Sequence, residues 1–161
     1  MSFTVTDPFA LFDQWLAEAT ATEPNDPNAM SLATLDANGM LSNRIVLLKG
    51  HDTDGFRFFT NYESRKGQAL AANPRAAALF HWKTLGRQVR VEGAIERLTA
   101  EQSQAYYDTR PRGSRIGAWA SLQSQALPER SSLQDRIDAF EAQFEGQETF
   151  PKPDYWGGFL I

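Results

Sequence analysis

The chain has 161 residues, contains no cysteine and carries a formal net charge of −4. At this length one domain is the usual organisation and can fold without disulfides or a structural metal, so we expect residues 1–161 to form a single domain. The absence of cysteine excludes disulfides, zinc–thiolate sites, iron–sulfur clusters and thiol nucleophiles.

The first residues, "MSFTVTDPFALFDQW", lack the basic segment and apolar core of a signal peptide. No run of about 18 apolar residues occurs, which excludes a membrane-spanning helix. We therefore expect a cytoplasmic protein.

Basic residues gather in the middle of the chain. Residues 44–115 contain thirteen basic and seven acidic residues, a net +6, whereas residues 1–43 contain no Lys or Arg. Such a distribution fits cations scattered over solvated strands, and it also fits a segment that binds anions such as phosphate. Because the chain as a whole is acidic, nucleic acid is the weaker choice of partner.

The first predicted element is a helix. Asp7 is a typical N-cap, and Pro8 is favoured at the first helical position. "EPNDPNA" ends this helix. Five apolar side chains fall on one of its faces: Phe9, Phe12, Trp15, Leu16 and Ala19.

A block of strands follows, most of them joined by short turns such as "ANG" and "HDTDG". The apolar run from Ile45 to Leu48 is typical of a strand covered on both faces. In the last strand of the block, Val89, Val91 and Ile95 alternate with polar residues. The predicted strands are residues 30–36, 43–50, 56–61, 75–82 and 87–98.

Several short helices accompany these strands. Ser64 can cap a helix that ends before Pro74. Thr99 and Gln102 form a capping box for a helix to about Thr109, which Pro111 ends. The remaining helical predictions are residues 114–121 and a helix to about Phe144, with a capping box at Ser131 and Gln134 and an apolar stripe at Leu133, Ile137, Phe140 and Phe144.

The chain closes with a linker, "EGQETFPKPD", and a strand that starts at Phe159 and has little left to pair with. Strands in one block with helices around them indicate a mainly β, α+β fold. We expect an antiparallel sheet closed into a small barrel.

The stretch "TNYESRKGQAL" is a candidate phosphate site. Arg65 and Lys66 fall in the first turn of the helix capped by Ser64, where the helix dipole makes cations unfavourable. A bound anion would offset this cost, because free backbone N–H groups and two cations form a phosphate cradle. Two solvated surface cations are the alternative.

Arg44 and Lys49 bracket the apolar run in "SNRIVLLKG". Five residues apart on a regular strand, they would point to opposite faces, and a bulge would be needed to bring them together. They could serve different partners, or simply mark the two ends of the strand.

The stretch "AYYDTRPRGSRIGAW" contains a second candidate anion site. Tyr106 and Arg110 are four residues apart and share a helix face, and Ser114 follows the break at Pro111. The basic loop "RPRGSR" also permits RNA binding, on weak evidence. In "SLQSQ", Gln123 and Ser124 could reach the edge of a heterocycle.

Other catalytic devices are absent from the sequence. His51 and His81 show no metal-ligand spacing, and no nucleophile elbow, dinucleotide-binding turn or Walker loop occurs. Two phosphate sites without an obvious nucleophile or base indicate a cofactor-dependent protein.

Six motifs occur in an order and spacing that resemble the FMN-dependent pyridoxine/pyridoxamine 5′-phosphate oxidases: "NRIVLLKG", "FFTNYESRKGQAL", "NPRAAALFHW", "RQVRVEGAIERL", "YYDTRPRGSRIGAWASLQS" and "WGGF". The resemblance covers about Asp7 to Phe159. It implies a split β-barrel that forms a homodimer, with FMN in clefts at the subunit interface.

The resemblance also implies site residues. The positions implied for FMN are Arg44, Ile45, Val46, Leu47, Leu48, Lys49, Phe59, Thr60, Arg65, Lys66, Gln88, Gln123 and Ser124. The positions implied for the substrate phosphate are Lys49, Tyr106, Arg110 and Ser114. No metal and no catalytic side chain is expected, because FMN accepts the hydride.

The implied reaction oxidises pyridoxamine or pyridoxine 5′-phosphate to pyridoxal 5′-phosphate, with O₂ as acceptor and hydrogen peroxide as product. After "WGGF" the family continues with strands whose Trp, Arg and His lie near FMN and substrate, and residues 1–161 contain no counterpart. We expect the absence of these side chains to weaken FMN binding less than it reduces turnover. The alternatives are an FMN-binding protein with little oxidase activity and a phenazine-pathway oxidase.

Overall fold

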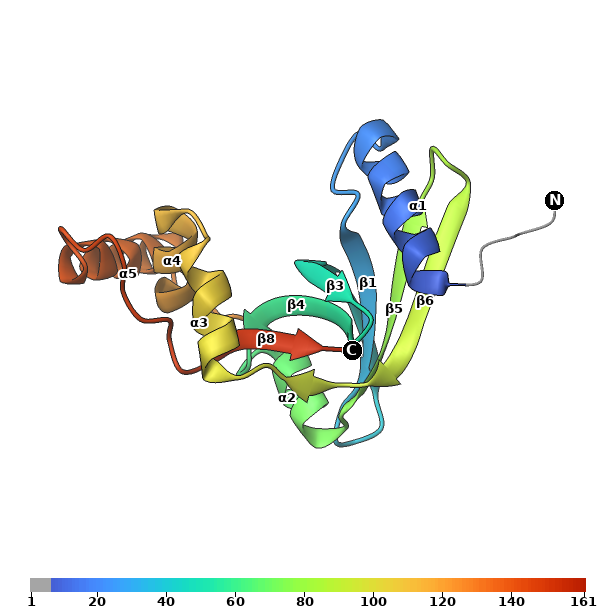
Figure 1. The fold of residues 1–161 in the computed structure, drawn as a ribbon. Coiled ribbons are helices and arrows are strands. Elements are labelled where there is room, and N and C mark those ends of the chain that lie inside the picture. Colours follow the sequence, from blue (N-terminus) through green and yellow to red (C-terminus); the bar gives the residue numbers. More distant parts are fainter. Residues whose placement is uncertain (1–6) are drawn as a thin grey trace.

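The computed structural model describes residues 7–161, so residues 1–6 of the stretch tested for a signal peptide lie outside it (Figure 1). Within this range no helix is both long and apolar enough to cross a membrane. The helices are α1 Pro8–Thr22, α2 Arg65–Ala72, α3 Ala100–Asp108, α4 Arg112–Ala120 and α5 Arg130–Gln143. The strands are β1 Ala29–Leu35, β2 Leu41–Leu47, β3 Gly50–Asp52, β4 Gly55–Asn61, β5 Arg75–Trp82, β6 Arg87–Ala94, β7 Glu96–Arg97 and β8 Trp156–Leu160.

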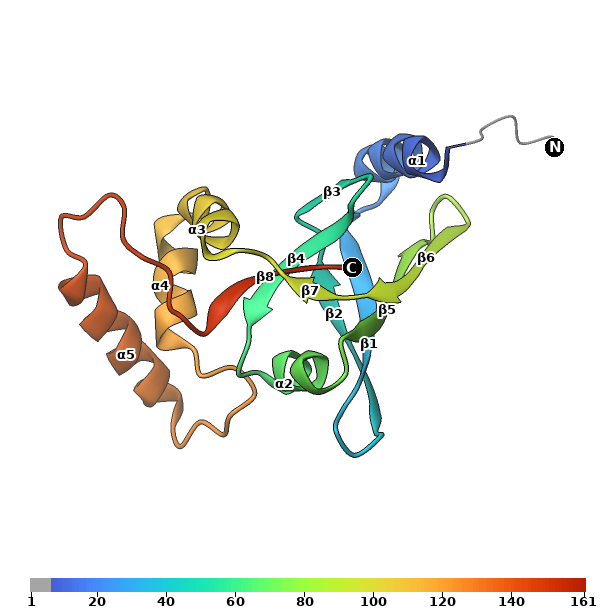
Figure 2. The same ribbon diagram turned by 60° about the horizontal axis from the view of Figure 1, so that its bottom comes forward.

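The strands form two antiparallel sheets of four strands, in the orders β2-β1-β5-β6 and β3-β4-β8-β7. This confirms the predicted antiparallel, mainly β fold with flanking helices. The expected closure into one small barrel is not found, because the described strands form two separate ladders and not one closed ring. Figures 1 and 2 show α3, α4 and α5 together on one side of the sheets and α1 on the other.

The chain crosses between the sheets at two places that the sequence pattern hides. The strand predicted over 43–50 ends at Leu47, because the Leu48 N–H donates to Asn28 and the Lys49 N–H donates to Arg57 of the second sheet. The strand predicted over 87–98 breaks at Ile95, which is buried in the core. Each predicted strand is therefore divided, and its end belongs to the other sheet.

The predicted turn over 51–55 is wrong in part. His51 and Asp52 belong to β3 and pair with Phe56 and Gly55, so the turn itself is only two residues long. Gly55 has φ of +145°, which favours glycine and lets the hairpin close this tightly.

The strand near the end of the chain is longer and better paired than predicted. It begins at Trp156 and lies between β4 and β7, with Gly157 opposite Thr60 and Leu160 opposite Glu96. The "WGGF" glycines are needed there. A Cβ on Gly157 would lie 2.1 Å from the Tyr62 hydroxyl oxygen.

The helix signals are confirmed at α1, α2 and α3. Asp7 accepts from the Phe9 N–H at 2.9 Å, and Thr99 and Gln102 form the capping box of α3. The predicted cap of α5 is wrong: Glu129 is its N-cap, and Gln134 instead binds Asp138. Helix α4 begins at Arg112, two residues earlier than predicted, because Pro111 serves as its N-cap.

Two apolar clusters hold the fold. The larger lies between the sheets and α1 and includes Phe58, Phe80 and Trp82. The smaller joins α3, α4, α5 and β8 through Tyr107, Ile116 and other side chains, including the predicted α5 positions Ile137, Phe140 and Phe144.

The expectation that the run from Ile45 to Leu48 is covered on both faces is wrong for the single chain. Leu48 is buried, but Ile45 is 64% and Leu47 is 36% exposed. One face of β2 therefore presents apolar side chains to the surroundings of this chain.

Candidate functional site

A cleft of about 480 Å³ opens between β2, β4, α2 and the α3–α4 corner. Most of the side chains predicted to bind FMN or substrate line it. Its walls are Ile45, Val46, Leu47, Lys49, Phe59, Thr60, Lys66, Tyr106, Thr109, Arg110, Pro111, Ser114, Gln123 and Trp156.

Lys66 is the cation at the α2 end of this cleft. Its Nζ donates to the hydroxyls of Thr60 at 3.0 Å and Ser64 at 3.2 Å, and to Gln123 Oε1 at 2.8 Å. Among residues 7–161 no carboxylate pairs with it. Burial lowers the pKa of Lys66 to about 8, and the charge of Arg44 acts in the same direction. The amine is therefore a cation that lacks an anion.

Arg44 lies beside this group but does not line the cleft. Its guanidinium donates to the Leu32 carbonyl at 2.9 Å and to the Thr34 hydroxyl at 2.8 Å, and it also contacts Ser42. Burial lowers the pKa of Arg44, and the charge of Arg65 lowers it further. Arg44, Arg65 and Lys66 thus form one region of positive potential, while Lys49 faces the cleft separately.

A turn after α4 delivers Gln123 to the cleft. Gln125 donates its N–H to the Leu122 carbonyl at 3.1 Å, and Ser124 adopts a left-handed φ of +68°. Such a φ is uncommon for a residue other than glycine. The turn aims Gln123 at Lys66 and Thr60, whereas Ser124 itself does not line the cleft.

The opposite side of the cleft is built by the α3–α4 corner. Tyr106 lies in α3 and Ser114 in the first turn of α4, but Arg110 lies between the two helices, so the prediction that Tyr106 and Arg110 share a helix face is wrong, although both line the cleft. Burial raises the pKa of Tyr106, so its hydroxyl keeps its proton at neutral pH. The Arg110 Nη1 atom is buried without a hydrogen-bond partner. The corner therefore offers a hydroxyl, a guanidinium and a serine side chain to one ligand.

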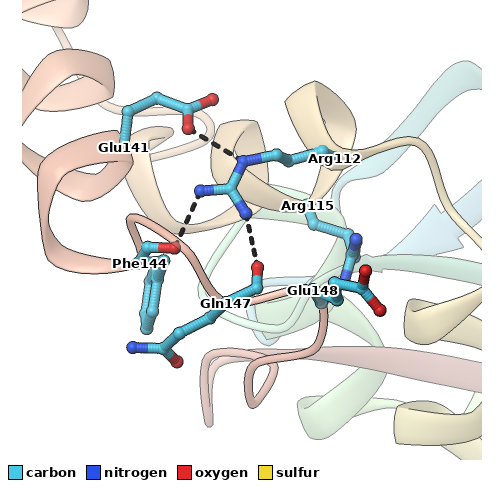
Figure 3. Close-up of polar contacts among 6 residues, drawn as sticks. All are labelled: Arg112, Arg115, Glu141, Phe144, Gln147 and Glu148. Atoms are coloured by element: carbon cyan, nitrogen blue, oxygen red, sulfur yellow. Dashed lines mark hydrogen bonds and ion pairs between the residues drawn. The ribbon is translucent and has the colours of Figure 1, made fainter.

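The other two arginines of "RPRGSR" do not line the cleft, and they connect α4 to α5 and to the segment that follows α5 (Figure 3). Arg112 donates to the Glu141 carboxylate at 3.0 Å and to the carbonyls of Gln147 at 2.7 Å and Phe144 at 2.9 Å. Arg115, which is 8% exposed, donates to the Glu148 carbonyl at 2.9 Å. Both guanidinium groups lie over the Phe150 ring. We call this group of contacts the arginine clamp.

The remaining predicted positions are elsewhere in the single chain. Leu48 is buried in the core, and Arg65 is exposed on α2 outside the cleft. Gln88 is exposed on β6, the edge of the first sheet opposite to β2.

Sequence reasoning missed Trp156, which lines the cleft from β8. The "WGGF" motif was noted for its resemblance, but no role was assigned to its tryptophan. A role for Trp156 in the site could have been inferred only with the β4–β8 pairing, which places it opposite Asn61 and beside the cleft.

The chain is similar to known proteins over most of its length. A family profile described as "Pyridoxamine 5'-phosphate oxidase" matches residues 16–144. A pyridoxine/pyridoxamine 5′-phosphate oxidase of Cupriavidus taiwanensis is 57% identical over 96% of this chain and 72% of its own length. The same enzyme of a Chelativorans species is 54% identical, over 96% of this chain and 74% of its own.

Two solved structures share the fold. PhzG from Burkholderia lata, in complex with tetrahydrophenazine-1-carboxylic acid, has a TM-score of 0.90 and 26% identity, over 99% of this chain and 77% of its own. A pyridoxamine 5′-phosphate oxidase-related, FMN-binding protein from Nostoc punctiforme has a TM-score of 0.72 and 16% identity, over 100% of this chain and 82% of its own. At that identity the second likeness concerns the fold alone.

Proposed function

Because this chain belongs to the pyridoxamine 5′-phosphate oxidase family, we propose that it is an FMN-dependent oxidase that forms pyridoxal 5′-phosphate from pyridoxamine or pyridoxine 5′-phosphate. The observation that carries the proposal is a cleft with a free cation at each side. Within residues 7–161 Lys66 has no carboxylate partner, and Arg110 has a buried Nη1 atom without an acceptor. Buried cations without anions are costly, and two phosphate groups would satisfy both.

The residues present fit FMN. Lys66 and Arg65 stand at the N-terminus of α2, where backbone N–H groups and the helix dipole favour a phosphate. Ile45, Val46 and Leu47 give the same cleft an apolar wall suited to a flat ring. When bound, FMN would supply hydride acceptance from the substrate and electron transfer to O₂.

The chain's own part in the reaction is to bind and orient the substrate. Lys49, Tyr106, Arg110 and Ser114 would hold its phosphate, with the protonated Tyr106 hydroxyl as a donor. With pyridoxamine 5′-phosphate the balance is substrate, O₂ and water giving pyridoxal 5′-phosphate, ammonia and hydrogen peroxide. With the alcohol no water is consumed and no ammonia forms.

The proposal includes a homodimer with the cleft at its interface. The exposed Ile45 and Leu47 of β2 are the apolar surface that a second copy would cover. Gln88 is too far along the first sheet to line its own chain's cleft, so the interface would have to supply it from the second copy. Sedimentation of the FMN-loaded protein tests this point, and a monomer at micromolar concentration would contradict it.

A phenazine-type flavin oxidase is the second candidate, favoured by the fold match to PhzG. Arg110 and Ser114 would then bind a ring carboxylate in place of a phosphate. The identity of 57% to the first relative, against 26% to PhzG, supports the B6 phosphate. An FMN-binding protein with little oxidase activity is the third possibility.

The deciding experiment is an anaerobic titration. The protein is loaded with FMN, and pyridoxamine 5′-phosphate is added while flavin absorbance is followed. Bleaching supports the proposal. Bleaching by a dihydrophenazine-type acid alone favours the second candidate, and FMN binding without bleaching favours the third. A protein whose spectrum does not respond to FMN would overturn all three, and Lys66→Met is the matched variant for the cofactor step.

A further inference from the structure

Arg110 is held in the cleft in an unusual way. Its side chain is half-buried, its Nη1 atom has no hydrogen-bond partner, and within residues 7–161 no carboxylate pairs with it. A guanidinium normally recovers the cost of leaving water through its five N–H donors. Here some other contact must keep the group at the cleft.

Aromatic faces make that contact. The Arg110 guanidinium carbon lies 4.8 Å from the centre of the Trp156 ring and 5.9 Å from that of Tyr107. Both distances fall in the range of cation–π attraction, for which tryptophan is the strongest partner. This attraction supplies no hydrogen-bond acceptor, and the Nη1 atom stays without a partner.

Trp156 is itself well fixed. It is 6% exposed and lies in β8, paired with Asn61 of β4. Its ring stacks on Phe59 at 5.5 Å and meets Tyr107 edge to face at 5.3 Å. Phe59 in turn stacks on Tyr106 at 3.8 Å. The indole is therefore a rigid surface anchored in a central strand and connected to both tyrosines of α3.

We infer that Trp156 is a positioning residue of the anion subsite: its indole face holds the Arg110 guanidinium toward the cleft and leaves the N–H donors free for the ligand's anionic group. The inference rests on the proposed function only for the identity of that group as a phosphate. A merely structural Trp156 would support the α3–α4 corner without affecting how Arg110 meets an anion.

The probe is pyridoxal 5′-phosphate, the product, because its binding to the FMN-loaded protein can be measured without turnover. Unphosphorylated pyridoxal is the companion ligand. We expect Trp156→Leu to weaken pyridoxal 5′-phosphate binding about tenfold and Trp156→Phe about threefold, following the strength of the ring face. Binding of pyridoxal should change little in either variant.

A double-mutant cycle with Arg110→Ala separates positioning from packing. If Trp156 acts through Arg110, Trp156→Leu should cause no further loss in the Arg110→Ala background. Should Trp156→Leu fold poorly, Trp156→Phe carries the same cycle. Trp119→Phe is the matched control, because this indole belongs to the same cluster, donates to the Pro151 carbonyl and lies under no cation among residues 7–161.

Three results would overturn the inference: wild-type affinity for pyridoxal 5′-phosphate in Trp156→Leu, an equal loss in the Arg110→Ala background, or an equal loss for pyridoxal. A wild-type protein that binds no pyridoxal 5′-phosphate would instead contradict the proposed function. FMN affinity, measured in each variant, shows whether the Lys66 side of the cleft is intact.

Discussion

Arg110 and Arg112 are two residues apart, yet their environments are opposite. Arg112 uses its donors on a carboxylate and two main-chain carbonyls, whereas Arg110 has a buried nitrogen without an acceptor and lies over an aromatic ring. A guanidinium that donates to carboxylate and carbonyl groups of its own chain holds the structure together, whereas one with no such acceptor can bind a ligand. Sequence alone cannot make this distinction within "RPRGSR".

The comparison also bears on the RNA hypothesis for this stretch. Arg112 and Arg115 face inward, over Phe150, and bind carbonyls of residues 144–148. Few of the loop's cations are left to form the basic surface that a phosphate backbone would require.

The largest effect is expected from Arg110→Ala. Removing a buried charge that meets an anion costs roughly 2 kcal/mol or more, so substrate phosphate affinity should fall at least about 30-fold. Pyridoxal 5′-phosphate titration of the FMN-loaded protein measures it. If Arg110→Ala lost less affinity for pyridoxal 5′-phosphate than Arg112→Ala, the proposed difference between the two arginines would be contradicted.

Arg112→Ala should mainly reduce stability. It removes charged hydrogen bonds to the carbonyls of Phe144, the C-cap of α5, and of Gln147 beyond it, and we expect the free energy of unfolding to fall by about 2 kcal/mol. Urea unfolding measures the change. Ligand affinity, extrapolated to fully folded protein, should stay within about threefold of wild type.

The pH dependence of FMN affinity should show the loss of the positive charge on Lys66. Its pKa of about 8 means that the cation is lost above that pH, so affinity should fall by up to about tenfold per pH unit between about pH 8 and 9.5. Lys66→Met should bind more weakly and without this slope.

The stability of the ligand-free protein should change with pH in the opposite direction to FMN affinity. The folded pKa of Lys66 lies below its ordinary value of 10.5, so the unfolded chain holds the extra proton between about pH 8 and 10. The contribution of this group to stability therefore rises with pH in that window. If the difference in free energy of unfolding between wild type and Lys66→Met did not change with pH, the lowered pKa of Lys66 would be contradicted.

The smallest effect is expected from Glu141→Gln. The Arg112–Glu141 ion pair is partly exposed, with side-chain exposures of 36% and 42%, and such pairs contribute about 0.5 kcal/mol. Urea unfolding of Glu141→Gln and Arg112→Ala, measured side by side, tests whether the hydrogen bonds to main-chain carbonyls contribute most of the stability of the arginine clamp. A loss equal to that of Arg112→Ala would show that the carboxylate dominates.

Local signals in the sequence predicted local structure well. The Asp7 and Ser64 caps and the capping box at Thr99 all lie where expected, because each depends on residues only two or three positions apart. The capping box predicted at Ser131 does not form, because α5 already starts at Arg130 with Glu129 as its N-cap. The strand breaks at Leu48 and Ile95 were not predicted, because they depend on hydrogen bonds to Asn28 and Pro74, about 20 positions away along the chain.

The site was predictable in its residue types but not in its partners. Motif order placed Lys66, Arg110 and Gln123 among the candidates, and the structure brings them to one cleft. Trp156 and the arginine clamp needed β8 and α5 in place, contacts that span about 30 or more positions along the chain. Gln88 remains a prediction that a single chain does not test.

The position of β8 has a consequence for the order in which the protein folds. This strand occupies the middle of the second sheet, and the Tyr62 hydroxyl reaches the Gly158 carbonyl across 96 positions of sequence. Pairings of such long range form slowly, and β4 keeps an unpaired edge until β8 arrives. Since Trp156 lies in β8, we expect the cleft to form late in folding and FMN to bind only after β8 has paired.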